Sequence, residues 1–103
     1  MAIGSSSIAS GQNSIATGLA TTAPAADELV LGRFNVGSCS SGGGLIWTST
    51  DPLLELGNGS SFTNKSDALV VYKNGNTSIQ GALTTGGPIT AQPGGDIPMY
   101  QGN

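Results

Sequence analysis

The chain has 103 residues, of which Gly, Ser, Thr and Asn make up nearly half, and it carries few charges with a net charge of −3. Each ordered residue costs roughly 1–2 kcal/mol of backbone entropy, so sparse apolar side chains disfavour an isolated compact globule. Mild acidity without a basic stripe excludes nucleic-acid binding, and no run of about 18 apolar residues is present to insert into a membrane.

Short apolar runs recur along the chain and predict β-strands rather than disorder. Examples are Leu29–Leu31, Leu45–Trp47 and Ala68–Tyr72. Disordered chains usually combine high net charge with few β-branched residues, and this sequence does not. We therefore expect an all-β protein whose interior is shared among several copies.

The N-terminal region contains a glycine repeat. Gly4, Gly11 and Gly18 are seven residues apart, and Gly32 follows fourteen residues after Gly18. Each glycine follows one or two aliphatic residues, and Ser or Asn fills the gap before the next strand. Glycine and serine are poor helix formers, which excludes a coiled coil. The spacing predicts a solenoid with about fourteen residues per coil, each coil having two short strands and two turns.

Alternation along these strands predicts a narrow apolar ridge. Side chains on a strand point to opposite faces in turn, so Ile3, Ile8 and Ile15 are expected on one side and small polar residues on the other. One such ridge is too narrow to form a core within a single chain. It is expected to meet its own copies around an axis.

Residues 1–32 resemble the head repeats of trimeric autotransporter adhesins, the YadA-like left-handed parallel β-roll. The resemblance implies a homotrimer of β-rolls with apolar faces on the three-fold axis. Thr21–Ala26 departs from the family pattern, so we expect two or three regular coils and then a departure. The matching residues are Ala2–Ser5, Ser7–Gly11 and Asn13–Gly18.

Residues 33–50 form a Gly/Ser-rich insertion followed by a strand. The run Gly37–Gly44 has the composition of a flexible loop. It precedes Leu45–Thr48, which predicts a strand carrying the only tryptophan.

Residues 51–84 contain a second pattern. Leu53–Ser60 predicts a strand and a glycine turn, and Ser66–Ile79 predicts a hairpin about Asn74-Gly75, because both turn residues tolerate positive φ. The run is similar to the module that precedes the stalk or chaperone domain in phage tail fibres. That resemblance implies a trimeric, interleaved β module and no chemistry.

Residues 85–103 predict a Pro/Gly-rich extended tail or linker. Proline lacks the N–H that a strand ladder needs, which confines such a segment to edges or extended chain. We expect it to lead into the next domain of a longer fibre.

The ionisable residues do not predict an active site. There is no histidine, the commonest general base and metal ligand. Asp27 and Glu28 are adjacent and would point to opposite faces, while the proline and strand between Asp51 and Glu55 argue against a shared face. We expect all four to be solvated, and the lone Cys39 has no base partner.

No metal or cofactor site is expected. The repeated Gly-Gly-x-Gly-x-Asp units of calcium-binding rolls are missing. The protein is therefore predicted not to be an enzyme.

The aromatic residues are the candidate receptor contacts. Trp47 and Tyr100 would stack on sugars if they are exposed. The alternative, which we favour for Trp47 and Tyr72, is that they fill the trimer core, where volume is needed.

The sequence thus predicts a structural segment of a homotrimeric, extracellular fibre that displays or forms a receptor-binding surface. The fibre would belong to a phage tail or a bacterial surface adhesin, and its receptor would be a cell-surface glycan or protein. Two alternatives remain. The first is an ice-binding β-solenoid, which needs regular rows of threonine; only Thr48–Thr50 resembles such a row. The second is a carbohydrate-processing tail spike, which needs paired carboxylates; the candidates are Asp51, Glu55 and Asp67.

Overall fold

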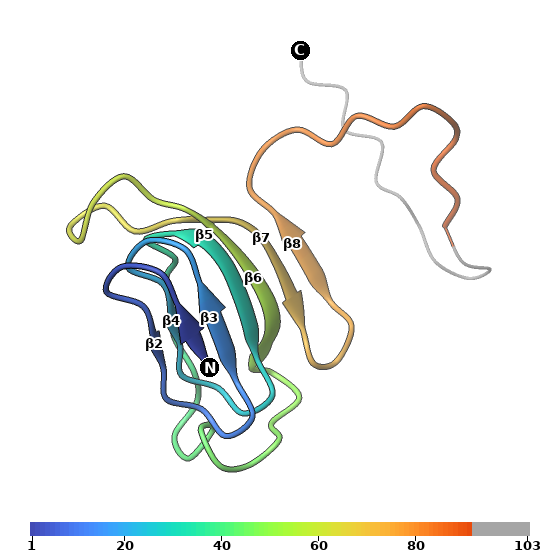
Figure 1. The fold of residues 1–103 in the computed structure, drawn as a ribbon. Coiled ribbons are helices and arrows are strands. Elements are labelled where there is room, and N and C mark those ends of the chain that lie inside the picture. Colours follow the sequence, from blue (N-terminus) through green and yellow to red (C-terminus); the bar gives the residue numbers. More distant parts are fainter. Residues whose placement is uncertain (92–103) are drawn as a thin grey trace.

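The protein is all-β. The computed structural model describes residues 1–91, and within them there are strands and turns but no helix (Figure 1). Six strands form a mixed sheet in the order β1-β3-β5-β6-β7-β8, and β2 and β4 form a small parallel sheet. The strands are β1 (Ala2–Ile3), β2 (Ile8–Ala9), β3 (Ile15–Thr17), β4 (Thr22–Ala23), β5 (Leu29–Arg33), β6 (Pro52–Asn58), β7 (Asp67–Tyr72) and β8 (Thr77–Ile79).

The fourteen-residue spacing of the glycines is the register in which the first strands pair. Parallel pairing aligns Ala2 with Ala16 and Ala16 with Val30 in the large sheet. In the small sheet it aligns Ile8 with Thr22. The expected departure at residues 21–26 is therefore wrong for β4, which keeps the same register by pairing Thr22 with Ile8 and Ala23 with Ala9.

Glycines stack where the paired strands β1, β3 and β5 turn. Gly4 and Gly18 both have positive φ, and a Cβ on either would clash with the carbonyl oxygen of the glycine fourteen residues later. The repeat thus needs glycine both for its backbone conformation and for close approach.

Gly18→Ala is expected to lower the free energy of unfolding by about 2 kcal/mol or more, because it adds backbone strain to a clash with fixed backbone atoms. Gly81→Ala is the matched control, since no atom lies within 4 Å of its added Cβ. Urea unfolding followed by circular dichroism measures both. Equal stability of the two variants would contradict the stacking.

The interior of the chain is lined by small residues. Ala16, Ala23 and Val30 are fully buried and pack together, with Ala9 against them. Ile3 is 54% exposed. The isoleucines therefore point away from this interior, and alanines, not small polar residues, occupy the opposite side of their strands.

The expected single ridge of isoleucines is also divided. Ile3 and Ile15 lie on the large sheet, whereas Ile8 lies on β2 in the small sheet. Ala9 packs on the shared interior, so Ile8 points outward on another face.

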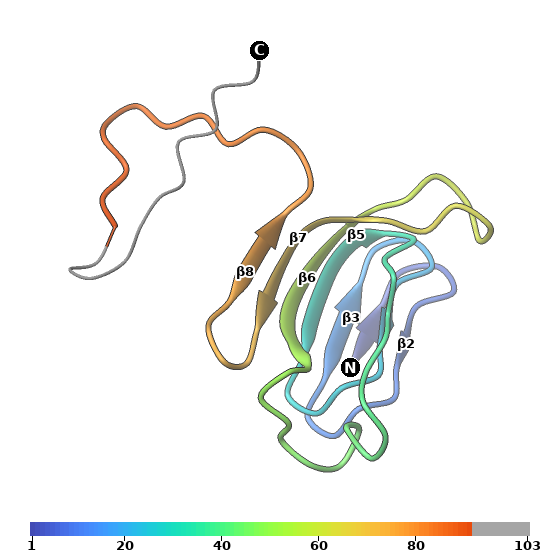
Figure 2. The same cartoon turned by 180° about the vertical axis from the view of Figure 1, so that it is seen from behind.

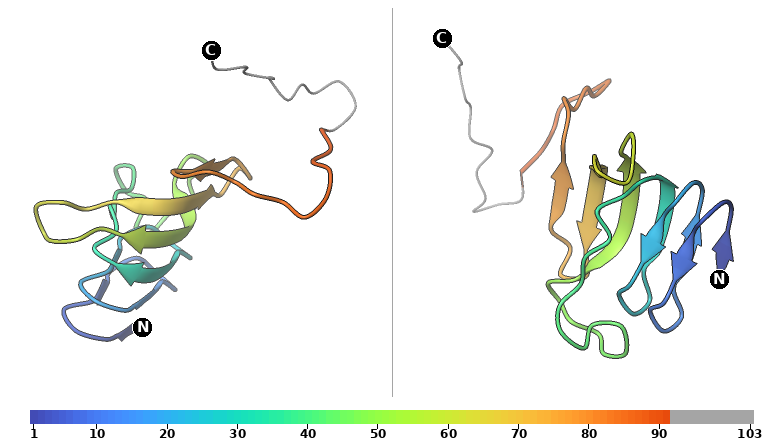
Figure 3. Two further views of the ribbon diagram at one scale, coloured as in Figure 1. Left: turned by 90° about the horizontal axis from the view of Figure 1, so that it is seen from above. Right: turned by 90° about the vertical axis from the view of Figure 1, so that its left-hand side faces the viewer.

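The C-terminal strands extend the same large sheet, as the side views show (Figure 3). β6 pairs parallel with β5, and β7 and β8 follow antiparallel. The hairpin predicted at Asn74-Gly75 is present: Val71 pairs with Thr77, and the Gly75 N–H donates to the Tyr72 carbonyl at 2.8 Å.

Residues 34–51, which we call the connection, join β5 to β6. Seen from behind, the connection runs back along the length of the strands, from the end of β5 to the opposite end of the sheet, where it turns into β6 (Figure 2). Its first part lies beside β4, because the Asn35 side chain accepts from the Thr22 N–H at 2.8 Å and donates to the Thr22 carbonyl at 2.9 Å.

The strand predicted at Leu45–Thr48 is wrong. Residues 41–45 form a turn followed by a bend at Ile46, and the N–H groups of Leu45 and Ile46 both donate to the Gly42 carbonyl. These local bonds use the donors that a strand ladder would need. Trp47 is half exposed as a result, with the Lys73 Nζ 5.0 Å from its ring centroid.

Candidate functional site

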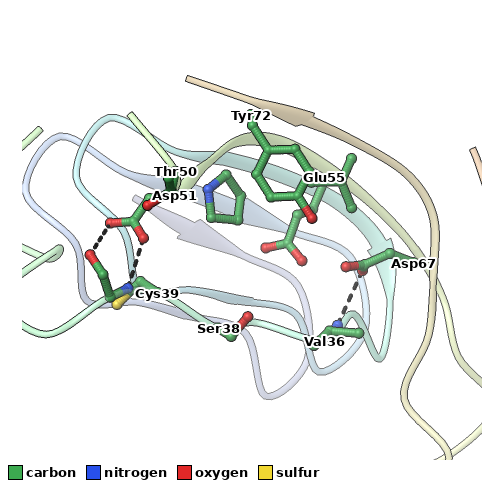
Figure 4. Close-up of a pocket in the computed structure, with 11 residues that line it drawn as sticks. Val36, Ser38, Cys39, Thr50, Asp51, Glu55, Asp67 and Tyr72 are labelled. Carbon is green, nitrogen blue, oxygen red and sulfur yellow. Dashed lines mark hydrogen bonds between the residues drawn. The ribbon is translucent and has the colours of Figure 1, made fainter. Parts of the chain in front are cut away.

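A cavity of about 410 Å³ lies between the connection and strands β6 and β7 (Figure 4). The connection forms one wall and the inward-facing side chains of the two strands form the other. We call it the carboxylate cavity, because Asp51, Glu55 and Asp67 line it. Its other lining residues are Val36, Ser38–Ser40, Thr50, Pro52, Val70 and Tyr72.

Several carboxylates expected to be solvated are buried. Glu28 and Glu55 are each 1% exposed and Asp51 is 2% exposed. The expectation holds only for Asp27, which is exposed and accepts a hydrogen bond from Asn13. Buried charges need donors. The connection supplies them to Asp51 and Glu55, because its N–H groups have few strand partners, whereas Glu28 accepts from the Ala25 N–H.

Asp51 fastens the connection at one point. Its Oδ1 accepts from the Ser40 N–H at 2.7 Å and its Oδ2 accepts from the Ser40 hydroxyl at 2.9 Å. Its carbonyl accepts from the Lys73 N–H at 3.0 Å. Asp51 and Glu55 line the same cavity, so the expectation that they do not share a face is wrong; a register shift between Pro52 and Leu54 interrupts the strand alternation between them.

Three carboxyl groups, which we call the carboxyl triad, meet from separate segments. Glu28 precedes β5, Glu55 lies within β6, and Asp67 begins β7. Figure 4 shows Glu55 and Asp67 directed into the cavity. Each group accepts one backbone N–H: Glu28 from Ala25 at 3.1 Å, Glu55 from Gly37 at 3.4 Å, and Asp67 from Val36 at 3.1 Å.

The triad holds protons more tightly than ordinary carboxyl groups. Burial raises the pKa of Glu28. Burial first, and then hydrogen bonding to Glu28, raises the pKa of Glu55 to about 7. Burial, followed by hydrogen bonding to Glu55, likewise raises the pKa of Asp67 to about 7. Desolvation disfavours the charged form, and neighbouring like charges add to that effect.

Lys73 and Cys39 are the other groups of interest near the cavity. The Lys73 Nζ is buried and has no hydrogen-bond partner among residues 1–91. The Cys39 thiol is exposed, and its pKa is raised, first by desolvation and then by Asp51. A raised thiol pKa leaves little thiolate at neutral pH, so Cys39 is not poised as a nucleophile.

Of the two predicted receptor contacts, the structure describes Trp47 alone. Trp47 is half exposed on the connection, and Tyr100 lies outside the described residues. Tyr72, expected in a trimer core, is half-buried and lines the carboxylate cavity. The sequence analysis did not predict the triad. One signal was present: Glu55 stands between Leu54 and Leu56 on a strand whose side chains alternate. If the two leucines face outward, Glu55 faces inward.

The carboxyl groups of the carboxylate cavity accept hydrogen bonds from the connection. The part of the chain that the structure describes has no group of His, Cys, Asp or Glu residues able to hold a metal ion. Glycoside hydrolysis requires a protonated acid and an ionised partner free to act on the sugar or on water. Glu55 meets the first requirement, but both oxygens of Asp51 are engaged by Ser40.

No protein-family model, curated protein or solved structure matches this chain. Residues 1–91 also contain no helix long and apolar enough to cross a membrane.

Proposed function

We propose that this chain is a structural segment of a homotrimeric extracellular fibre, without catalytic activity. The first strands form a left-handed parallel β-roll that leads into an interleaved β module. The fibre displays or forms a receptor-binding surface for a cell-surface glycan or protein, in a phage tail fibre or a bacterial surface adhesin.

The observation that carries the proposal is an aliphatic surface on the large sheet, on the side away from the Ala16–Val30 interior. We call it the outer face. Strand pairing gives it two rows of side chains without a single charged residue. One row contains Ile3, Thr17, Leu31, Leu56, Leu69 and Ile79, and the other contains Ile15, Leu29, Leu54, Val71 and Thr77.

The distribution of side-chain size supports shared burial. The fully buried hydrophobic residues are mostly alanines, whereas Ile3, Leu31 and Ile79 remain exposed on the outer face. A self-sufficient chain would place its large aliphatic residues inside, since burial returns about 25 cal/mol per Å² of apolar surface. A continuous apolar face of this kind marks an interaction surface.

Three-fold assembly also protects the strand edges. β1 and β8 are the edges of the large sheet. Unpaired edges invite uncontrolled strand addition, and packing three chains around an axis covers or blocks them. Three identical chains then offer three identical exposed surfaces to a receptor, which raises avidity without strong single sites.

Sedimentation equilibrium tests the proposal. The expected mass is three times the chain mass of 10.1 kDa, maintained on dilution. A fluorescently labelled trimer should also bind intact cells that carry the receptor. A well-folded single chain at every concentration would overturn the trimer, whereas a trimer that binds no cell surface would overturn the display role alone.

A further inference from the structure

Two members of the carboxyl triad link the connection to strands β6 and β7. No strand ladder makes this link. Val36 and Gly37 of the connection donate their N–H groups to Asp67 and Glu55, which lie on neighbouring strands of the large sheet. Asp51 closes the far end of the connection through Ser40. The fastening of the connection over the cavity therefore depends on carboxyl groups.

The triad is also joined within itself. Glu55 lies between Glu28 and Asp67, close enough to each for a proton to be shared between two carboxyl groups. An ionised carboxylate only accepts hydrogen bonds, so a bond between two carboxyl groups contains a proton. The Oε2 atoms of Glu28 and Glu55 are buried and have no hydrogen-bond partner in residues 1–91. Shared protons would satisfy these two atoms.

We propose that the carboxyl triad is a proton-dependent clasp that fastens the connection to the large sheet and loosens when its three carboxyl groups ionise. The clasp acts within one chain and does not depend on the fibre function.

The charges around the triad favour this behaviour. Lys73 is the one basic group that acts on Glu28, and its Nζ lies over Trp47 without an ion pair to the triad. Asp51 adds a further acidic group to the cavity, while Cys39 and Tyr72 complete the ionisable lining. Loss of the shared protons would therefore leave several buried acidic groups facing one lysine, which low-dielectric surroundings penalise.

The direction of the pH effect follows from proton linkage. Glu55 and Asp67 have a pKa of about 7 in the folded chain, above the ordinary values of 4.5 and 3.8. Between those ordinary values and pH 7 the folded chain holds more protons than the unfolded chain. The stabilisation is therefore complete below the ordinary values and is lost as the pH rises through about 7.

Thermal unfolding at pH 5 and pH 8 tests the clasp. The wild-type midpoint is expected to be lower at pH 8 by roughly 5–10 °C, the shift that a modest loss of stability gives in a chain of this size. Hydrogen-exchange protection at Val36 and Gly37, corrected for the intrinsic pH dependence of exchange, should fall about tenfold, which corresponds to one pKa unit of differential interaction.

Two variants separate the clasp from general acid–base effects. Glu55→Gln supplies an amide donor where glutamate needs a proton, so most of the pH dependence should disappear. Asp27→Asn, at an exposed carboxylate, should keep the wild-type pH dependence. A wild-type midpoint at pH 8 equal to or above that at pH 5 overturns the clasp, as does full pH dependence in Glu55→Gln.

Carbon-13 carboxyl titration by NMR provides a readout that needs no variant to fold. Two side-chain carboxyl groups should titrate near pH 7, and Glu55 and Asp67 should be those two. If every carboxyl group titrates below pH 5, the clasp is wrong. Sedimentation at both pH values shows whether assembly changes at the same time.

Discussion

Leu31→Glu is expected to convert the proposed three-fold assembly into single chains. Leu31 lies on β5, in the middle of the large sheet, and pairs with Leu56 in the outer face. It is 38% exposed in one chain. If the outer face is buried between copies, the substitution places three carboxylates in an apolar interior, which costs several kcal/mol per uncompensated charge. Sedimentation equilibrium should then give one-third of the wild-type mass.

Leu45→Glu is the matched control. Leu45 is 76% exposed on a turn of the connection, away from the outer face. The same change of chemistry there should leave the mass and its resistance to dilution unchanged. If Leu31→Glu keeps the wild-type mass, the outer face is not the surface that meets other copies. If both variants lose the wild-type mass, the added charge disrupts the assembly wherever it is placed, and the outer face has no special role.

The pairing register of the N-terminal strands could be predicted because the turns between them require glycine at fixed positions. The spacing between Gly4 and Gly18 equals the register in which Ala2 meets Ala16. Both glycines occupy a backbone conformation and a close approach that other residues do not fit. The Asn74-Gly75 hairpin could be predicted for the same reason, since its geometry is set within a few residues.

The side of the strand that faces inward could not be predicted from the repeat. Both Ala16 and Ile15 are apolar, and alternation alone places them on opposite faces without saying which face is inside. In the folded chain the alanine side of these strands packs inward, with Ala16, Ala23 and Val30 in one buried cluster. The choice depends on how the two sheets pack on each other, which the aliphatic pattern does not encode.

The candidate site was missed because its residues are far apart in sequence. Glu28, Glu55 and Asp67 meet only after β5, β6 and β7 have paired. Ordinary burial statistics place each of them in solvent. Two of these carboxyl groups accept hydrogen bonds from N–H groups of the connection. The connection is a Gly/Ser-rich segment, so its composition predicts a loop and does not indicate that it donates hydrogen bonds to buried carboxyl groups.

Asp51→Ala is expected to lower the free energy of unfolding by about 2–4 kcal/mol. The substitution removes two hydrogen bonds to a charged acceptor, each worth about 1.5–3 kcal/mol in isolation, and the two are not additive. Both bonds go to Ser40, whose N–H loses its acceptor in the variant. The loss should release the part of the connection around Ser40 from Asp51, which directly precedes β6, and urea unfolding at pH 6 measures it.

Ser40→Ala distinguishes fastening from a simple loss of side-chain packing at Asp51. It removes only the hydroxyl bond at 2.9 Å and keeps the N–H bond at 2.7 Å, so its cost should be about 1 kcal/mol. In a double-mutant cycle the two changes should couple by about 0.5–1 kcal/mol, because the hydroxyl bond is lost only once. If Asp51→Ala costs no more than Ser40→Ala, the buried carboxylate does not fasten the connection, and the N–H of Ser40 finds another partner at no loss.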